Sequence, residues 1–125
     1  DRFMLVTDAM PCVGSAQRSF LLQGREIRVH DGRCEDSNGT LAGSALDMAS
    51  AVRNAVAMLG IDLPLAVRMA SRHPAAFLGM DHELGEIAPG YRANLVLADD
   101  DLNVHGTWID GDYQPAAAEA AQCIA

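Results

Sequence analysis

The sequence predicts an α/β fold, on the evidence of two apolar runs and one well-marked helix between them. Phe3–Val6 is apolar throughout and Asn94–Ala98 nearly so, which is typical of strands buried on both faces of a parallel sheet. Only one strand–helix unit accompanies these runs, whereas a (β/α)8 barrel needs about 250 residues. The 125 residues therefore predict either an unusual α+β domain or a piece of a larger fold.

A hairpin region follows the first apolar run. Residues 25–30 alternate polar and apolar side chains, which predicts a strand with one buried and one wet face. Asp31-Gly32 and Asn38-Gly39 favour tight turns, because both pairs tolerate positive φ. The expected strands are Ser19–Leu22, Arg25–His30 and Arg33–Glu35, and the second turn leads into residues 40–43.

Two helices are predicted next. Ser44, with Asp47 three residues on, favours a helix N-cap. The apolar stripe behind it has helical spacing and ends at Gly60; its members are Ala45, Ala49, Val52, Val56 and Leu59. Asp62 is the expected cap of a second helix, with Pro64 in its first turn. Pro74 interrupts that helix, and a further turn closes at Gly79.

Beyond Leu84 the chain changes to short β-rich runs separated by turn signals. Thr107–Ile109 is an expected strand that turns at Asp110-Gly111. The last residues, 115–125, are expected to be a frayed helix or a tail.

Composition limits the possible partners and compartment. The formal net charge is -8, which argues against a nucleic-acid partner because phosphate binding needs a basic surface. No apolar run approaches the roughly 18 residues of a membrane span, so no membrane partner is expected. The cysteines, Cys12, Cys34 and Cys123, are odd in number and form no zinc or disulfide pattern. A reducing cytoplasm is the expected location.

Several motifs occur in one order along nearly the whole chain. They are "LVTDAMP.VG" from Leu5, "NGTLAGSALDM..AVRN" from Asn38, "A..HPA..LG" from Ala70, "LG.I.PG..ANLVL" from Leu84 and "TW..G" from Thr107. This series resembles the C-terminal part of the N-acetylglucosamine-6-phosphate deacetylase family, within the amidohydrolase superfamily. The first two motifs are specific to the deacetylases, and the last two are shared by many amidohydrolases.

The resemblance implies a C-terminal fragment of a metal-dependent (β/α)8 barrel together with strands of a small β-sandwich. On that template residues 1–83 hold the last barrel strand and helices with an inserted β-hairpin. Residues 84–125 hold the C-terminal strands of the sandwich and a tail. The rest of the barrel would lie upstream, and association with that missing part is expected.

The resemblance also implies that Asp8 is the catalytic carboxylate. Asp8 follows the first apolar run, and barrel enzymes carry their chemistry at the C-terminal ends of the strands. A carboxylate there can take a proton from the attacking water and return it to the amine that leaves. Without the resemblance, an equally good interpretation of Asp8 is a turn or cap residue.

The resemblance further places Leu41, Ala42 and Gly43 at the amino-sugar phosphate substrate. It implies a divalent metal of zinc or iron type, whose ligands lie outside this chain, and a homodimer. The four histidines have no partner at metal-ligand spacing and are expected to be structural. The implied reaction converts N-acetylglucosamine 6-phosphate to glucosamine 6-phosphate and acetate, and the fragment alone is expected to be inactive.

Two alternatives stay open. Another amidohydrolase, of dihydroorotase or deaminase type, would fit residues 84–113 equally well but would not be expected to carry "NGTLAGSAL". A non-catalytic module that binds a partner through its exposed sheet is the other alternative.

Overall fold

The computed structural model describes residues 3–116, and these form two compact units. Residues 6–51 make up one unit, called here the meander unit. Residues 1–5 and 52–125 make up the other, called here the helix unit. The division falls within helix α1, Met48–Leu59. The predicted division at residues 83 and 84 concerns the domains of a larger fold and stays a prediction.

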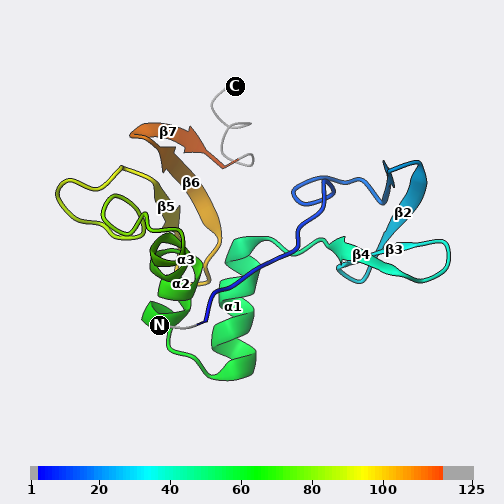
Figure 1. Cartoon of the computed structure of the whole chain (residues 1–125), viewed down its shortest axis with the longest axis horizontal. Helices are drawn as coiled ribbons and strands as arrows, with labels where there is room; N and C mark the ends of the chain where they lie inside the picture. The colour runs from blue at the N-terminus through cyan, green and yellow to red at the C-terminus, as the bar shows by residue number, and fades with distance from the viewer. Residues whose placement is uncertain (1–2, 117–125) are drawn as a thin grey trace. The chain divides into compact units, whose positions relative to one another are not determined.

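The meander unit is a four-stranded antiparallel sheet in the order β1-β2-β3-β4 (Figure 1). Its strands are β1 (Ser19–Leu22), β2 (Arg25–His30), β3 (Arg33–Asp36) and β4 (Leu41–Ser44). Asp31 and Gly32 join β2 to β3 with φ of 47° and 77°, the left-handed geometry expected from that pair. The three predicted strands are confirmed, with β3 one residue longer than expected, and the segment after the second turn forms a fourth strand.

The core of the meander unit lies under β2 and β3. Cys12, Ile27 and Cys34 are its buried residues. Half-buried apolar side chains pack around them: Met10, Phe20, Leu22, Val29, Ala42 and Ala45. Because Met10 and Cys12 belong to this core, the loop that follows Asp8 is attached to the sheet.

The helix unit contains the remaining elements. They are most of α1, α2 (Leu63–Ala70), α3 (Arg72–Phe77), and a second antiparallel sheet of β5 (Leu95–Ala98), β6 (Val104–Ile109) and β7 (Asp112–Pro115). Asp62 caps α2 as predicted, because its carboxylate accepts a hydrogen bond from the N–H of Leu65 at 2.9 Å. The unit's core is small, with Val52, Ala55 and Ala66 buried in it.

Two predicted strands differ from the structure. Phe3–Val6 belongs to no strand within residues 3–116; the N–H of Leu5 donates to the carbonyl of Met69 on α2 instead. A strand needs a partner ladder, and no other described segment supplies one there. The run at Leu95–Ala98 does form a strand, but Val96 and Leu97 are 65% and 47% exposed, so neither face of β5 is fully covered by the described residues. Of the predicted tail at residues 115–125, Pro115 instead ends the strand Asp112–Pro115, and residues 117–125 lie outside the described residues.

Helix α1 begins later than predicted. Ser44 is the last residue of β4, and Asp47 takes the capping position by accepting from the N–H of Ser50 at 2.7 Å. The buried positions are Ala51, Val52 and Ala55, whereas Leu59, at the end of the predicted stripe, is 69% exposed. The prediction of Ser44 as the cap is therefore wrong, since a second capping residue lies closer to the helix.

Candidate active site

Asp8 stands in an exposed loop with an uncommon backbone conformation. Its φ is 49°, in the left-handed region that residues with a Cβ avoid. The side chain is exposed and open to solvent. Such a conformation costs on the order of 1–3 kcal/mol and persists only where the surroundings fix it, which is a common property of functional sites.

The surroundings that fix Asp8 come from the end of β4. The N–H of Ser44 donates to the carbonyl of Asp8 at 2.8 Å, and the N–H of Met10 donates to the carbonyl of Ser44 at 2.9 Å. Ala9 and Ser44 form an isolated parallel β-bridge. The loop that carries Asp8 thus runs alongside the end of β4 as a short extra strand.

Gly43 allows this close approach. A Cβ at this position would lie 2.9 Å from the carbonyl oxygen of Asp8 and 2.6 Å from Cγ of Met10. Its φ of 140° is also one that other residues rarely adopt. Glycine is therefore required here by the neighbouring loop of the protein itself.

Leu41 and Ala42 line a cavity of about 180 Å³ in the same unit. The other walls come from the β1–β2 turn, from β2 and from the turn before β4; they are Leu22, Gln23, Arg25, Ile27, Asp36 and Thr40. Leu41 is 64% exposed and Gly43 is buried. The structure thus gathers Asp8 and Leu41–Gly43 in one unit, with Gly43 against Asp8 and the two preceding residues at the cavity.

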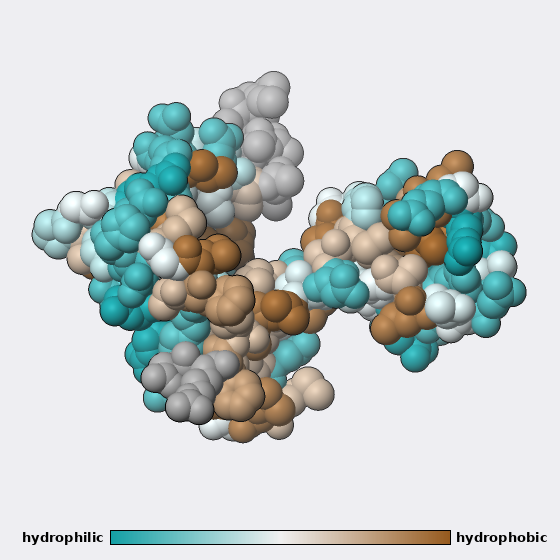
Figure 2. Space-filling view, in the orientation of Figure 1, coloured by the Kyte–Doolittle hydropathy of each residue, from teal (hydrophilic) through white to brown (hydrophobic). Residues whose placement is uncertain are grey.

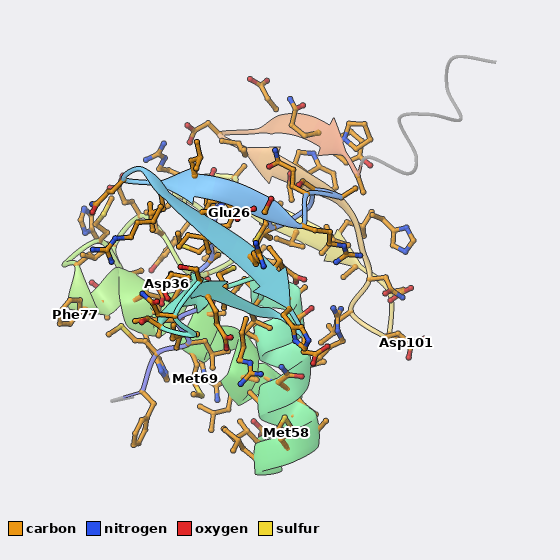
Figure 3. All side chains as sticks on the ribbon, turned by 90° about the vertical axis from the view of Figure 1, so that its right-hand side faces the viewer. Glu26, Asp36, Met58, Met69, Phe77 and Asp101 are labelled. Atoms are coloured by element: carbon orange, nitrogen blue, oxygen red, sulfur yellow. The ribbon has the colours of Figure 1, made fainter. Side chains whose placement is uncertain are left out.

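The turn before β4 is set by Asp36, which ends β3 (Figure 3). Its Oδ1 accepts hydrogen bonds from the N–H groups of Asn38 and Thr40, at 2.8 Å and 2.9 Å. These bonds hold the pKa of the Asp36 carboxyl below its usual range, with Thr40 the larger cause. Asp36 thereby fixes where β4 starts.

Two thiols meet beneath the site. Sγ of Cys12 lies 3.5 Å from Sγ of Cys34, and both side chains are buried. Burial raises the pKa of the Cys34 thiol to about 11, with smaller contributions from Cys12 and from the charge of Asp8. No local sequence signal predicts this pair, because 22 residues separate the two cysteines and only the folded chain brings them together.

Two of the histidines make contacts that do not involve Asp8. His73 makes a ring hydrogen bond with the carbonyl of Phe3 at 2.8 Å, and His30 pairs with Asp31 at 3.0 Å. Within residues 3–116, no group of three or more His, Cys, Asp or Glu side chains is placed to hold a metal ion. The resemblance places the metal ligands outside this chain, and that stays a prediction.

Comparison with known proteins identifies the family. Residues 1–113 match the Amidohydrolase family. The chain belongs to this family.

Two similar proteins are named as deacetylases of an N-acetylhexosamine 6-phosphate. The chain is 45% identical over 121 residues to the N-acetylgalactosamine-6-phosphate deacetylase of Shewanella sp. strain ANA-3, covering 96% of this chain and 30% of that protein. It is 42% identical over 111 residues to the putative N-acetylgalactosamine-6-phosphate deacetylase of Escherichia coli K12, covering 89% of this chain and 66% of that protein.

A solved amidohydrolase has the same fold over the matched part. The N-acetylglucosamine-6-phosphate deacetylase of Pasteurella multocida superposes with a TM-score of 0.85 at 42% identity. The match covers 90% of this chain and 30% of that one. The chain thus spans about a third of the length of these two deacetylases, from Shewanella and Pasteurella. None of the helices described in residues 3–116 is long and apolar enough to cross a membrane.

Proposed function

We propose that this chain is part of an enzyme that hydrolyses the acetamide group of an N-acetylhexosamine 6-phosphate. The specific substrate proposed is N-acetylglucosamine 6-phosphate, and the products are glucosamine 6-phosphate and acetate. The observation that best supports this is the attachment of Asp8 to Gly43 and Ser44, which brings the proposed catalytic and substrate segments together.

The proposed chemistry of Asp8 is proton transfer. Its carboxylate accepts a proton from the water that attacks the amide carbon, and the tetrahedral intermediate forms. The same carboxyl then gives the proton to the amide nitrogen, so that the C–N bond breaks and the amine leaves. An exposed carboxylate on a fixed backbone suits both steps, because it can reach a substrate while its direction is constrained.

Leu41–Gly43 are proposed to contact the sugar. The 180 Å³ cavity at Leu41 and Ala42 supports this role, since it offers apolar walls beside polar groups of Arg25 and Thr40. A divalent metal of zinc or iron type is also proposed for the whole enzyme. Its ligands would lie outside the described residues, because residues 3–116 offer no suitable set.

A second substrate is favoured by the relatives. The Shewanella and Escherichia coli proteins, at 45% and 42% identity, are named for N-acetylgalactosamine 6-phosphate. The two sugars differ only in the configuration of one hydroxyl group. The relatives reported above are named as deacetylases, which favours a deacetylase over a dihydroorotase or a deaminase. A homodimer in the cytoplasm stays a prediction.

The test uses the complete protein that carries these residues. Acetate release is measured from both N-acetylhexosamine 6-phosphates for the unchanged protein, Asp8→Asn and Asp31→Asn. Asp31 is the matched control, because it is exposed and has nearly the same φ, 47° against 49°. We expect Asp8→Asn to lower kcat by on the order of a thousandfold, and Asp31→Asn to leave it unchanged. Near-normal turnover in Asp8→Asn would contradict the assignment.

A further inference from the structure

Ser44 is the residue most closely tied to the backbone around Asp8. Its hydroxyl donates to the carbonyl of Thr7 at 2.5 Å. Its own N–H donates to the carbonyl of Asp8, and its carbonyl accepts from the N–H of Met10. The hydroxyl also accepts from the N–H of Leu46 at 3.0 Å, which fixes the rotamer of the serine itself.

These bonds act on both backbone dihedrals of Asp8. The carbonyl of Thr7 belongs to the peptide plane before Asp8, and rotation about φ moves Asp8 against that plane. The carbonyl of Asp8 belongs to the peptide plane after it, which rotation about ψ moves. Ser44 holds one plane with its side chain and the other with its main chain. The left-handed conformation of Asp8, at φ of 49°, is therefore held in place from a single residue.

The direction of the carboxylate follows from that conformation. Asp has a short side chain, so the position of its oxygen atoms depends mainly on φ, ψ and one rotamer. If the hydrogen bond from the Ser44 hydroxyl to the Thr7 carbonyl is lost, Asp8 can relax toward the conformations that residues with a Cβ prefer. The carboxylate would then point elsewhere without any change at the sugar-contacting residues.

We infer that Ser44 is a positioning residue for Asp8, which acts through the Thr7 and Asp8 carbonyls and does not touch the substrate. The inference rests on the proposed role of Asp8 as the proton-transfer group. It gives the serine of the "LAGS" segment a function that is distinct from sugar contact by Leu41–Gly43.

The experiment compares Ser44→Ala, Ser44→Thr and Ser50→Ala in the complete protein, with Asp8→Asn alongside. Ser44→Ala removes only the hydroxyl and leaves the main-chain bonds intact. Ser44→Thr restores a hydroxyl at the same position. Ser50 is the matched control, since its half-buried hydroxyl donates to Asp47 at 2.7 Å in the same unit. Deacetylation kcat, KM and melting temperature are measured for each.

We expect Ser44→Ala to lower kcat by roughly tenfold to a hundredfold, because a misplacement of about 1 Å costs that much. KM should change by less than about twofold, and Ser44→Thr should recover most of the rate. Ser50→Ala should lower the melting temperature with kcat unchanged. This split between kcat and KM, with rescue by threonine, is not expected of a serine that only stabilises the fold.

Two results would overturn the inference. One is normal kcat in Ser44→Ala while Asp8→Asn is inactive, which would leave the proposed function standing. The other is a loss of kcat that follows the melting temperature equally in Ser44→Ala and Ser50→Ala. If Ser44→Ala does not fold, Ser44→Cys replaces it, because a thiol is a weaker donor of similar size; its kcat should fall between those of alanine and serine. Normal turnover in Asp8→Asn would end both proposals together.

Discussion

The meander unit and the helix unit are stabilised in different ways. In both units every strand pairs with its neighbour along the chain, but in the meander unit hydrogen bonds also fasten the Asp8 loop to β4. In the helix unit the buried core consists mainly of small side chains, and most of the exposed large apolar residues lie there, among them Phe3, Leu59, Phe77 and Ile87. Hydrophobic residues gather on the visible face of its helices (Figure 2).

The two units therefore depend on different kinds of interaction, local in the meander unit and longer-range in the helix unit. The meander unit is specified by tight turns and antiparallel pairing, which act over a few residues. The helix unit leaves apolar surface uncovered within the described residues, so its stability depends on what packs against it. Point substitutions should therefore damage the meander unit at identifiable hydrogen bonds, whereas the helix unit should be most sensitive to the absence of neighbours.

The largest expected effect is a complete loss of activity in residues 1–125 on their own. Added zinc or iron should not produce acetate release, because residues 3–116 provide no set of ligands for a catalytic metal. Purified chain is assayed with N-acetylglucosamine 6-phosphate beside the complete protein. Clear turnover by a monomer of these 125 residues would contradict the proposal that the metal ligands lie elsewhere.

The same preparation should associate through the helix unit. Phe77 and Leu21 are both 76% exposed, but Phe77 belongs to the helix unit and Leu21 to the meander unit. We expect Phe77→Ser to reduce the average particle size in light scattering more than Leu21→Ser does. Equal effects would show that exposed apolar area matters regardless of the unit.

Substitution of Gly43 should break the meander unit at its closest contact. In the complete protein we expect Gly43→Ala to lower kcat on the order of a hundredfold, because the new Cβ displaces the carbonyl of Asp8. Gly24→Ala is the control: Gly24 also has positive φ, 79°, but nothing lies within 4 Å of its Cβ position. It should lose about 1 kcal/mol of stability and no activity. Similar kcat values in the two variants would contradict the contact.

In the helix unit a comparable local change should have a modest effect. Asp62→Ala removes the side-chain cap of α2 and is expected to lower the free energy of unfolding of the complete protein by about 1 kcal/mol, with kcat unchanged. Asp62→Asn keeps an acceptor for the N–H of Leu65 and should retain most of that stability. Chemical denaturation of both variants measures the difference.

The smallest expected effect is on the pH dependence of stability. The pKa of Asp36 is lowered in the folded protein, so its contribution is present above the unfolded value of about 3.9 and is lost as pH falls further. Asp36→Asn cannot titrate, so its stability should fall less steeply below about pH 4. Thermal melts between about pH 2 and 6 test this, and an identical acid slope in both proteins would contradict it.

The sequence predicted the local features of the fold well. The alternation of residues 25–30 and the Asp31-Gly32 pair were sufficient for β2 and its turn, because both signals act within a few residues. The turn at Gln23 and Gly24 was missed, since glutamine seldom takes the φ of 50° that it has there. Ser44 was misjudged because a capping pattern is equally consistent with Asp47 as the cap.

Motifs along the chain could suggest candidate site residues but not the contacts between them. The motifs predicted Asp8 and Leu41–Gly43 as site residues, but the approach of Gly43 to Asp8 accompanies a parallel bridge between Ala9 and Ser44 that no local pattern predicts. Cys12 and Cys34 likewise meet through a contact between residues far apart in the sequence. For Phe3–Val6 the local pattern predicted a strand that the described residues do not form. An apolar run becomes a strand only where a neighbouring segment can pair with it.

The Ala9–Ser44 bridge has a consequence for self-association. β4 is the last strand of its sheet, and an open edge is a template on which a second molecule can add a strand. The Asp8 loop occupies the end of that edge by pairing with Ser44. A loop that swung free would uncover N–H and carbonyl groups for intermolecular pairing. The hydrogen bonds that hold the proposed catalytic carboxylate therefore also cover part of an edge open to aggregation.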